Sequence, residues 1–418
     1  MRILYLVHQF FPNHYTGTER FTLNLAQQMS RMGHLPLVMT YERDAGEHEG
    51  FTPIHADVLM KRYSFETVPV ISFMQTRTRT FYELTDSSIE EAFKRLHIKC
   101  DIVHICHPMW LSSVANACQE GGIPIVLTVT DPTLLCPRSL IDIGLRLCNG
   151  PMKGKKCIRR CHLENNIIQR YQEALNLFNM ADEVTTSSEF TRSLFRRNGW
   201  TRRIRIVAHS VDYNYVRRPE LTNQGSREVS FGYIGTISWH KGLHILVNAF
   251  RKVKSRNLRL NIYGSVNEDL QYGNEIVRVA KEDTRIEFRG SFDIVNSAEV
   301  MNNVSVLVVP SVYYDNYPLV TLMALAYKTP VIGSDIGGIP EVIQHGKNGF
   351  LFKPGNSDEL ASLIKRIAAK PELLKRLREN IVSPRRVEEE ALDYENIYRK
   401  LTVQAARAAD SRSHRAIL

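Results

Sequence analysis

A lysine held in a glycine-bounded turn is the residue of this chain best suited to phosphate chemistry. Lys241 lies in the segment GTISWHKG, which follows the apolar run FGYI and precedes the helical pattern LHILVNAF. At the mouth of a sheet, a lysine in such a turn can meet a diphosphate as a point charge. The spacing differs from that of the P-loop, which argues against a nucleoside triphosphatase. The sequence therefore predicts a diphosphate contact at Lys241.

Two polar residues later in the chain point to sugar binding. Asp315 and Asn316 come after the apolar run VLVV and shortly before a helical pattern. Such a pair at the carboxyl end of a strand can accept hydrogen bonds from sugar hydroxyls, but it is also a common helix N-cap. Further along, Gly337 and Gly338 allow a backbone to approach a ligand closely. The sugar-binding and N-capping interpretations of Asp315 and Asn316 both stay open.

The apolar run ILYLV near the start of the chain leads into a loop, residues 8–18, and then into a helical pattern from about Glu19. Gly17 lies just before this helix, where backbone amides and the helix dipole can face an anion. A glycine before a helix is also an ordinary structural turn. Gly17 is therefore a candidate donor contact, with the structural turn as the alternative.

Four of the seven cysteines lie in one irregular insertion, residues 132–165; they are Cys136, Cys148, Cys157 and Cys161. In a reducing compartment, four thiols this close can bind Zn²⁺ tetrahedrally and order a loop that has little core of its own. Because the spacing is not a paired CxxC set, free thiols, disulfides and an iron–sulfur centre remain alternatives. The odd cysteine count, without an export signal in the first residues, predicts a reducing cytosol.

The same insertion is the most basic part of the chain. Its cationic residues suit an anionic lipid headgroup or a lipid-linked acceptor, although a solvated charged loop has the same composition. They are Lys153, Lys155, Lys156, Arg159 and Arg160. The whole chain has 54 Lys and Arg against 44 Asp and Glu, a formal net charge of +10, which favours phosphate-bearing partners or an anionic membrane face. Nucleic acid is the less favoured alternative, and we expect no nucleic-acid partner.

Short β-branched runs alternate with amphipathic helical patterns along most of the chain. This alternation predicts right-handed crossovers and parallel sheets covered on both faces. A polar stretch without periodicity, residues 217–228, is typical of a linker. We therefore predict two Rossmann-like, doubly wound α/β domains facing a cleft, residues 1–216 and 229–386, followed by a C-terminal helix and basic tail over 387–418. Ligands of such sheets bind at the carboxyl ends of the strands, where the candidate residues above fall.

The composition is that of an ordinary globular protein. Apolar residues make up 43% and charged residues 23% of the chain, which excludes a disordered, collagen-like or coiled-coil chain. The longest apolar runs fall far short of the ~20 residues of a membrane-spanning helix. We thus expect a cytoplasmic protein whose association with a membrane, where it occurs, is peripheral.

Taken in order, the motifs resemble those of the family-4 retaining glycosyltransferases of GT-B architecture. The N-terminal stretch ILYLVHQFFPNHYTGTERFTLNLAQQMSRMGH resembles the family's opening strand, glycine-rich loop and first helix. In the second half, YIGTISWHKGLHILVNAF, VVPSVYYDNYPLVTLMALAYKTPVIGSDIGGIPEVI and HGKNGFLFKPGNSDELASLI match in order and spacing. The closing helix, with Tyr394 and Tyr398, resembles the segment that folds back onto the first domain. The resemblance covers nearly the whole chain.

The resemblance implies transfer of a sugar from a nucleotide-diphosphate donor to a glycan or lipid-linked acceptor, with retained anomeric configuration, as in polysaccharide biosynthesis. The donor would bind mainly to the second domain, without a cofactor for the chemistry, and the acceptor mainly to the first. Asp131, in TVTDPTLLCPR, would lie at the reacting centre together with Lys241 and Asp315. The remaining donor-side positions would be Gly17, Thr236, Arg289, Asn316, Tyr317 and Met323.

Three positions depart from the family pattern. The family's two glutamates, separated by seven residues, correspond to Asp315 and Met323, and a thioether cannot replace a carboxylate that holds ribose hydroxyls. Thr236 stands where an arginine often accompanies the phosphate-binding lysine, and Thr130 where a histidine usually precedes Asp131. These departures leave open a catalytically weak or inactive GT-B protein that acts by binding. A sugar phosphorylase is a weaker alternative, because no motif marks a pyridoxal phosphate or dedicated phosphate pocket.

Overall fold

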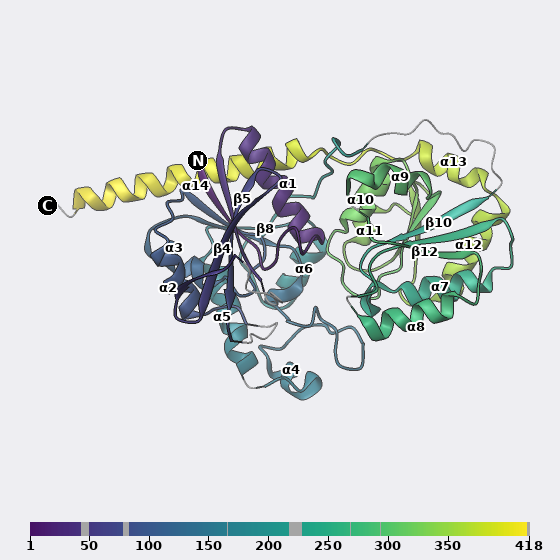
Figure 1. Ribbon diagram of the computed structural model, residues 1–418, viewed down its shortest axis with the longest axis horizontal. Coiled ribbons are helices and arrows are strands. Elements are labelled where there is room, and N and C mark those ends of the chain that lie inside the picture. Colours follow the sequence, from purple (N-terminus) through teal and green to yellow (C-terminus); the bar gives the residue numbers. More distant parts are fainter. Residues whose placement is uncertain are drawn as a thin grey trace. The chain divides into compact units, whose positions relative to one another are not determined.

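The computed structural model contains two compact units, each with a core of its own (Figure 1). The first is made of residues 1–209 and 387–418, and the second of residues 210–386. The predicted linker, 217–228, lies outside the described residues except for its last position. The structure describes residues 1–42, 50–77, 83–164, 166–216, 228–267, 269–292 and 294–415.

The first unit is built on a sheet with the strand order β3-β4-β5-β2-β1-β6-β7-β8-β9. Neighbours are parallel from β5 to β9 in this order, whereas β4 is antiparallel to both β3 and β5. The strands are β1 (Arg2–Leu6), β2 (Leu35–Tyr41), β3 (Thr52–His55), β4 (Val58–Phe65), β5 (Val68–Gln75), β6 (Ile102–Ile105), β7 (Ile125–Val129), β8 (Glu183–Thr186) and β9 (Arg205–Ile206).

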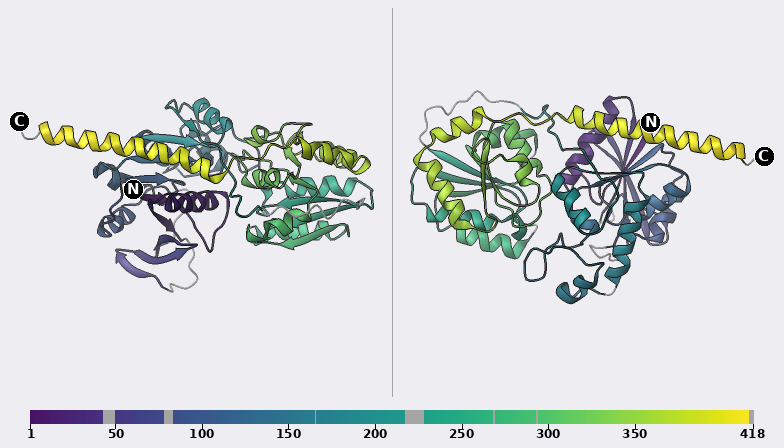
Figure 2. Two further views of the ribbon diagram at one scale, coloured as in Figure 1. Left: turned by 90° about the horizontal axis from the view of Figure 1, so that it is seen from above. Right: turned by 180° about the vertical axis from the view of Figure 1, so that it is seen from behind.

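The helices of the first unit include one from the end of the chain. They are α1 (Gly17–Arg31), α2 (Ser87–Arg95), α3 (Ser113–Glu120), α4 (Lys155–Cys161), α5 (Asn166–Met180), α6 (Glu189–Arg197) and α14 (Val387–Arg415), with a 3₁₀ turn, η1, at Pro132–Leu134. Helix α14 lies alongside α1 (Figure 2). Within the described residues, no helix is both long and apolar enough to cross a membrane.

Two buried tyrosines of α14 join the end of the chain to the core formed by residues 1–209. The hydroxyl of Tyr398 lies 2.6 Å from Nδ1 of His104, and the hydroxyl of Tyr394 lies 3.1 Å from Oγ1 of Thr128. Burial lowers the pKa of His104 to about 3, so this ring is neutral at pH 7. The aromatic spacing in α14 is therefore explained by packing of the first unit.

The second unit contains a fully parallel sheet with the order β12-β11-β10-β13-β14-β15. Its strands are β10 (Val229–Ile234), β11 (Leu258–Tyr263), β12 (Ile286–Gly290), β13 (Val306–Val309), β14 (Val331–Ser334) and β15 (Gly349–Phe352). Its helices are α7 (Leu243–Lys252), α8 (Leu270–Ala280), α9 (Ser297–Asn302), α10 (Leu319–Ala326), α11 (Ile339–Val342), α12 (Ser357–Ala369) and α13 (Glu372–Glu379), with 3₁₀ turns η2 at Trp239–Lys241 and η3 at Ile294–Asn296.

Helices cover both faces of this second sheet, which explains the continuous apolar run of β13. Val306 and Val308 belong to one core cluster, to which α7 and α12 contribute, while Leu307 and Val309 belong to another, to which α10 contributes. Successive side chains of a strand point to opposite faces, so a strand buried on both sides is apolar at every position. The predicted fold class of two parallel-sheet α/β domains is confirmed.

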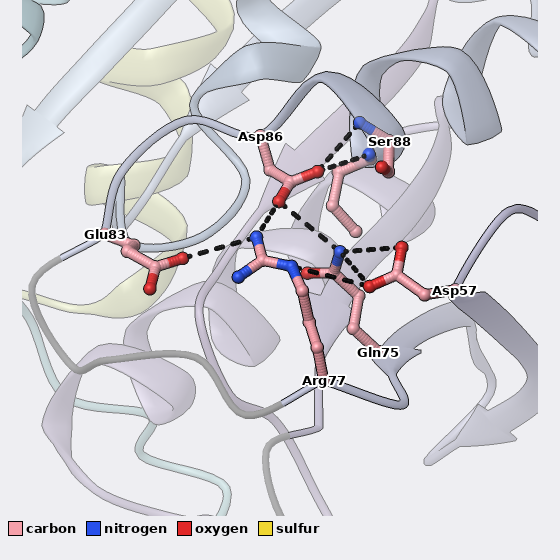
Figure 3. A network of polar contacts seen from close by, with 7 residues as sticks. Asp57, Gln75, Arg77, Glu83, Asp86 and Ser88 are labelled. Carbon is pink, nitrogen blue, oxygen red and sulfur yellow. Dashed lines mark hydrogen bonds and ion pairs between the residues drawn. The ribbon is translucent and has the colours of Figure 1, made fainter.

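The strand and helix patterns in the sequence did not predict the antiparallel strands β3 and β4, strand β5 or helix α2. Strands β3 and β4 are largely half-buried or exposed at the edge of the sheet, so their sequences, TPIH and VLMKRYSF, carry no continuous apolar run. A polar network holds this part together (Figure 3): Arg77 pairs with Asp57, Glu83 and Asp86, and Asp86 caps α2 by accepting the backbone N–H of Ser88 at 2.8 Å. These long-range polar contacts give no local sequence signal.

Candidate functional site

Three loops of the second unit leave the carboxyl ends of adjacent strands. The turn with Lys241 follows β10, the segment with Asp315 follows β13, and the Gly337–Gly338 pair follows β14. Strands β10, β13 and β14 are neighbours in the sheet. Ligands of open α/β sheets bind at such carboxyl ends.

Two glycines allow these loops to touch. Gly242 has a φ of +74°, and a Cβ at this position would lie 1.9 Å from the carbonyl oxygen of Pro310. Gly337 has a φ of +64°, and a Cβ there would lie 2.2 Å from the carbonyl oxygen of Asp315. An L side chain at either position would therefore be strained and would force the loops apart. Both glycines therefore allow the loops around Lys241 and Asp315 to lie in close contact.

Lys241 and Asp315 form an ion pair at the centre of a small polar cluster. The ammonium lies 3.1 Å from Oδ2 of Asp315 and donates to the hydroxyl of Tyr313 at 2.7 Å. Tyr313 in turn donates to Oδ1 of Asp315 at 3.0 Å, and the hydroxyl of Ser311 donates to Oδ2 at 3.0 Å. Both carboxylate oxygens are thus engaged by neighbouring side chains, and the aspartate holds the lysine in place.

The electrostatics of this cluster keep the lysine charged. Burial opposes the charge of Lys241, but the carboxylate of Asp315 and the contact with Tyr313 outweigh it and raise the lysine pKa. Burial, together with the nearby ammonium, lowers the pKa of His240 to about 4, so this ring is neutral at pH 7. The second unit therefore presents a fixed cation beside a neutral imidazole.

The other predicted donor-side residues of the second unit lie at varying distances from this cluster. Asn316 is buried next to Asp315, and Tyr317 packs against the apolar cluster that contains β13. Thr236 accepts the hydroxyl of Tyr233 at its carbonyl oxygen, at 2.7 Å. Arg289 lies on the edge strand β12, two strands from β10, where it pairs with Glu287 at 2.6 Å. Met323, on α10, is half-buried against the same apolar cluster as Tyr317.

A second polar cluster lies in the first unit, again at the carboxyl ends of neighbouring strands. His8 follows β1, His107 follows β6 and Asp131 follows β7. Nε2 of His107 lies 3.3 Å from Oδ2 of Asp131, and the rings of His107 and His8 have centroids 3.8 Å apart. Asp131 also accepts the backbone N–H of Thr133 at 2.8 Å, which caps η1. Asp131 therefore lies beside two imidazoles at the carboxyl end of β7, and its role at the reacting centre stays a prediction.

Helix α1 brings a buried acid to the same cluster. Gly17 is the first residue of α1, and Glu19, only 1% exposed, lies with Oε1 3.8 Å from Nδ1 of His8. Thr16 donates its hydroxyl to the other oxygen of Glu19 at 2.5 Å. Among the residues that the structure describes, neither Nδ1 of His8 nor Oε1 of Glu19 has a hydrogen-bond partner. A ligand hydroxyl is one group that would satisfy them.

Burial and charge shift the pKa values of this cluster in opposite directions. Burial alone would raise the pKa of Asp131, but His107 and the hydrogen bonds from His107 and Thr133 hold it well below its usual value. Burial, followed by repulsion from His107, lowers the pKa of His8, and burial raises that of Glu19. The cluster thus combines an ionised aspartate with a neutral His8.

His8, Glu19 and His107 are not among the site residues predicted from the sequence. His8 and His107 each come two residues after the end of a buried strand, and this position is the feature of the sequence that could have identified them. Thr130, at the position where the family usually has a histidine, donates its hydroxyl to the carbonyl oxygen of Cys106 at 3.3 Å. The imidazole beside Asp131 is supplied by His107, from the neighbouring strand.

The four clustered cysteines line one cavity of about 10 Å³ in the insertion; they are Cys136, Cys148, Cys157 and Cys161. Cys136 and Cys157 are buried, while Cys148 and Cys161 are half-buried, and all are free thiols. Burial raises the pKa of Cys157 to about 12. In the described parts of the chain, no three His, Cys, Asp or Glu side chains stand where they would already hold a metal ion. The zinc site stays a prediction.

Two family descriptions match this chain. Residues 15–215 match the family model of Glycosyltransferase Family 4, and residues 228–370 match that of Glycosyl transferases group 1. An uncharacterized glycosyltransferase of Methanocaldococcus jannaschii is 30% identical over 219 residues, 52% of this chain and 58% of that relative. N-acetyl-alpha-D-glucosaminyl L-malate synthase of Bacillus anthracis is 32% identical over 128 residues, 30% of this chain and 33% of that relative. These alignments span less than two thirds of either relative.

Solved structures share the fold over nearly the whole chain. Sucrose-phosphate synthase from Thermosynechococcus elongatus aligns with a TM-score of 0.74 at 22% identity, covering 96% of this chain and 99% of the other. HepE of Anabaena, in complex with UDP and glucose, aligns with a TM-score of 0.66 at 18% identity, covering 98% and 99%. At these identities the likeness shows the fold.

Proposed function

Since the chain belongs to the glycosyltransferases that combine a Glycosyltransferase Family 4 domain with a group 1 domain in a GT-B fold, we propose that it transfers a sugar from a nucleotide-diphosphate donor to an acceptor. The observation that carries this proposal is the Lys241–Asp315 pair at the carboxyl ends of adjacent strands. The nucleotide and sugar bound in HepE support a donor of this class.

Lys241 would stabilise the departing diphosphate. As the bond between the anomeric carbon and the diphosphate oxygen breaks, negative charge grows on that oxygen, and a preorganised cation lowers the energy of this state. An ammonium has three N–H donors, and the contacts with Asp315 and Tyr313 account for two. The third N–H can donate a hydrogen bond to a phosphate oxygen. Asp315 acts as a positioning residue for Lys241, with Asn316 as the adjacent candidate for sugar hydroxyls.

The His107–Asp131 pair of the first unit would bind sugar hydroxyls at the reacting end. An ionised carboxylate accepts hydrogen bonds from hydroxyls, and the neighbouring imidazole orients it. We also propose retention of the anomeric configuration and a glycan or lipid-linked acceptor in polysaccharide synthesis. Both rest on the resemblance of the sequence motifs to the family-4 retaining glycosyltransferases, with which the Family 4 match over residues 15–215 agrees.

A catalytically silent binding protein is the second candidate. The observation in its favour is Met323, which packs half-buried among apolar side chains where the family has a carboxylate for the donor ribose. Asp315 does not replace that carboxylate, because Lys241, Ser311 and Tyr313 already engage both of its oxygens.

We propose that the insertion holds one structural Zn²⁺. Four thiolates are a donor set that zinc prefers, and all four line the same cavity. The metal would have to draw the thiols from their present positions, and it would order a segment that has little regular structure.

A panel of nucleotide-diphosphate sugars with a nucleotide-release assay tests the proposed activity. Transfer predicts release with at least one donor, and a rise of the melting temperature with the matching nucleotide, because a ligand that binds only the folded state stabilises it. A shift without release would favour the silent binding protein. Neither shift nor release with any donor would overturn both.

A further inference from the structure

The insertion exposes a group of large apolar side chains. Among the described residues, four of the twelve large apolar side chains that are strongly exposed lie within ten positions. These four, the apolar tip, are Ile143 at 50%, Leu145 at 47%, Leu147 at 40% and Met152 at 64% exposure. Single exposed apolar residues are ordinary, but a group of this kind marks an interaction surface.

The backbone of the insertion is ordered so that these side chains stay outside. Ile141 and Leu147 form an antiparallel bridge, and the N–H of Cys148 donates to the carbonyl oxygen of Leu140 at 2.7 Å. Between them, the carboxylate of Asp142 accepts the backbone N–H groups of Gly144 and Arg146. Figure 1 shows α4, which follows this segment in the chain, at the periphery of the first unit. The tip is therefore presented by a closed loop.

The insertion that carries the apolar tip is strongly basic. Residues 132–165 contain seven Lys and Arg against two Asp and Glu, a net charge of +5 out of +10 for the chain. Asp142 is buried and already paired with Arg146. Besides Arg146, which is paired with Asp142, the exposed cations of the insertion are Lys153, Lys155, Arg159 and Arg160.

We propose that the apolar tip and these four cations dock on the surface of a bilayer that contains anionic lipids. Aliphatic side chains enter the boundary between headgroups and acyl chains, while the cations stay over the negative headgroups. Charge complementarity selects this partner: nucleic acid attracts the cations but gives aliphatic side chains no favourable environment. The docking does not depend on sugar transfer, and no membrane-spanning element is required.

Sedimentation with lipid vesicles tests the docking in the absence of donor, so that its outcome is independent of the proposed enzyme activity. The probes are vesicles of phosphatidylcholine, with and without about a third of phosphatidylglycerol, at low and high salt. We expect binding to the anionic vesicles and a loss of binding with salt. Equal binding to both vesicle types, or no binding to either, would overturn the proposal.

Two variants separate the apolar and the charged contributions. Ile143→Ser/Leu145→Asn/Met152→Asn removes three of the four apolar side chains of the tip, and asparagine tolerates the positive φ of Leu145 and Met152. A second variant replaces Lys153, Lys155, Arg159 and Arg160 by glutamine. We expect each to weaken the partition coefficient about tenfold or more. Unchanged partition of both variants would contradict the docking.

Matched control variants change the same kinds of residue elsewhere. Leu392→Gln/Val403→Gln removes two exposed apolar side chains of α14, and a quadruple glutamine variant of exposed lysines removes the same net charge from the second unit. The four lysines are Lys347, Lys365, Lys370 and Lys375. Near-normal binding of both controls supports the proposal. A loss in the lysine control equal to that of the insertion variant would show a general charge effect and overturn it.

A fluorescent reporter tests the tip in the otherwise intact chain. In Ile143→Trp we expect a blue shift of the emission when anionic vesicles are added, since the indole leaves water. A concentration-dependent shift without vesicles would assign the tip to a second copy of the chain and refute the lipid surface.

Discussion

Replacing Lys241 by methionine tests the charge at the centre of the second-unit cluster. Methionine keeps much of the side-chain volume but leaves Asp315 with only the hydroxyl donors of Ser311 and Tyr313. Exposed ion pairs contribute ~0–1 kcal/mol, whereas breaking a fully buried pair costs ~3–5 kcal/mol. Since the side chains of Lys241 and Asp315 are 27% and 11% exposed, we expect the free energy of unfolding to fall by about 2 kcal/mol.

The larger effect is expected on sugar transfer. A preorganised donor to a developing oxyanion is worth about 10²–10³ in kcat. Lys241→Met should therefore lower nucleotide release at saturating donor by about this factor, measured with the donor that the panel identifies. The double variant Lys241→Met/Asp315→Asn should recover most of the lost stability, because no unpaired carboxylate remains, without recovering the rate.

A control on the same domain removes a lysine of a different kind. Lys252, at the end of α7, pairs with Asp358 at 2.7 Å, and both side chains are well exposed. Lys252→Met should leave rate and stability nearly unchanged. If Lys241→Met keeps its turnover within about threefold of the wild type, Lys241 does not stabilise the leaving group and the assignment is refuted.

Four other parts of the structure lead to expected outcomes. Gly242→Ala should lower the free energy of unfolding, measured with urea, by about 3 kcal/mol or more, because a Cβ would meet the Pro310 carbonyl oxygen. Gly346→Ala, with a φ of +76° but open space, should lower it by about 1 kcal/mol. Equal losses would contradict the close approach at Gly242. The pKa of His104 is lowered to about 3 in the folded chain. The contribution of its neutral ring to the free energy of unfolding is therefore fully present above pH ~6.5 and is lost as the pH falls toward 3. Between pH 7 and 5, the free energy of unfolding measured with urea should fall by about 2 kcal/mol more in the wild type than in His104→Asn. Equal losses in the two proteins would show that His104 is not the cause of the pH dependence. Asp131→Asn should lower kcat by about 10²-fold in the nucleotide-release assay, and unchanged turnover would remove Asp131 from the reaction. Elemental analysis should find about one Zn²⁺ per chain, lost in Cys157→Ser; zinc-free wild-type protein would contradict the metal site.

Much of the fold could be predicted from local patterns. The runs around Tyr5, Leu127 and Val308 are apolar at nearly every position because strands of a parallel sheet are buried on both faces. Lys241 could be predicted as a site residue because a glycine-bounded turn between a strand and a helix is a local feature of the sequence. Strands β3 and β4 could not be predicted, because both are largely half-buried or exposed and therefore carry no continuous apolar run.

The contacts within each site depend on strand order, which local patterns do not reveal. Lys241 and Asp315 are paired because β13 lies next to β10, although three α-helices and two strands separate β10 from β13 along the chain. His8, His107 and Asp131 meet for the same reason, at the ends of β1, β6 and β7. The sequence shows which residues follow a strand, but only the order of strands shows which of them are neighbours.

Strand order also decides which departures from the family pattern matter. Thr130 replaces a histidine, but the neighbouring strand supplies His107, with Nε2 3.3 Å from Asp131, so an imidazole–carboxylate pair is retained. Met323 has no such substitute: it packs against apolar side chains, and Asp315 is already held by Lys241. We therefore expect a loss of the proposed sugar transfer relative to the family to arise at the predicted ribose contact of Met323, whereas the first unit keeps an imidazole–carboxylate pair.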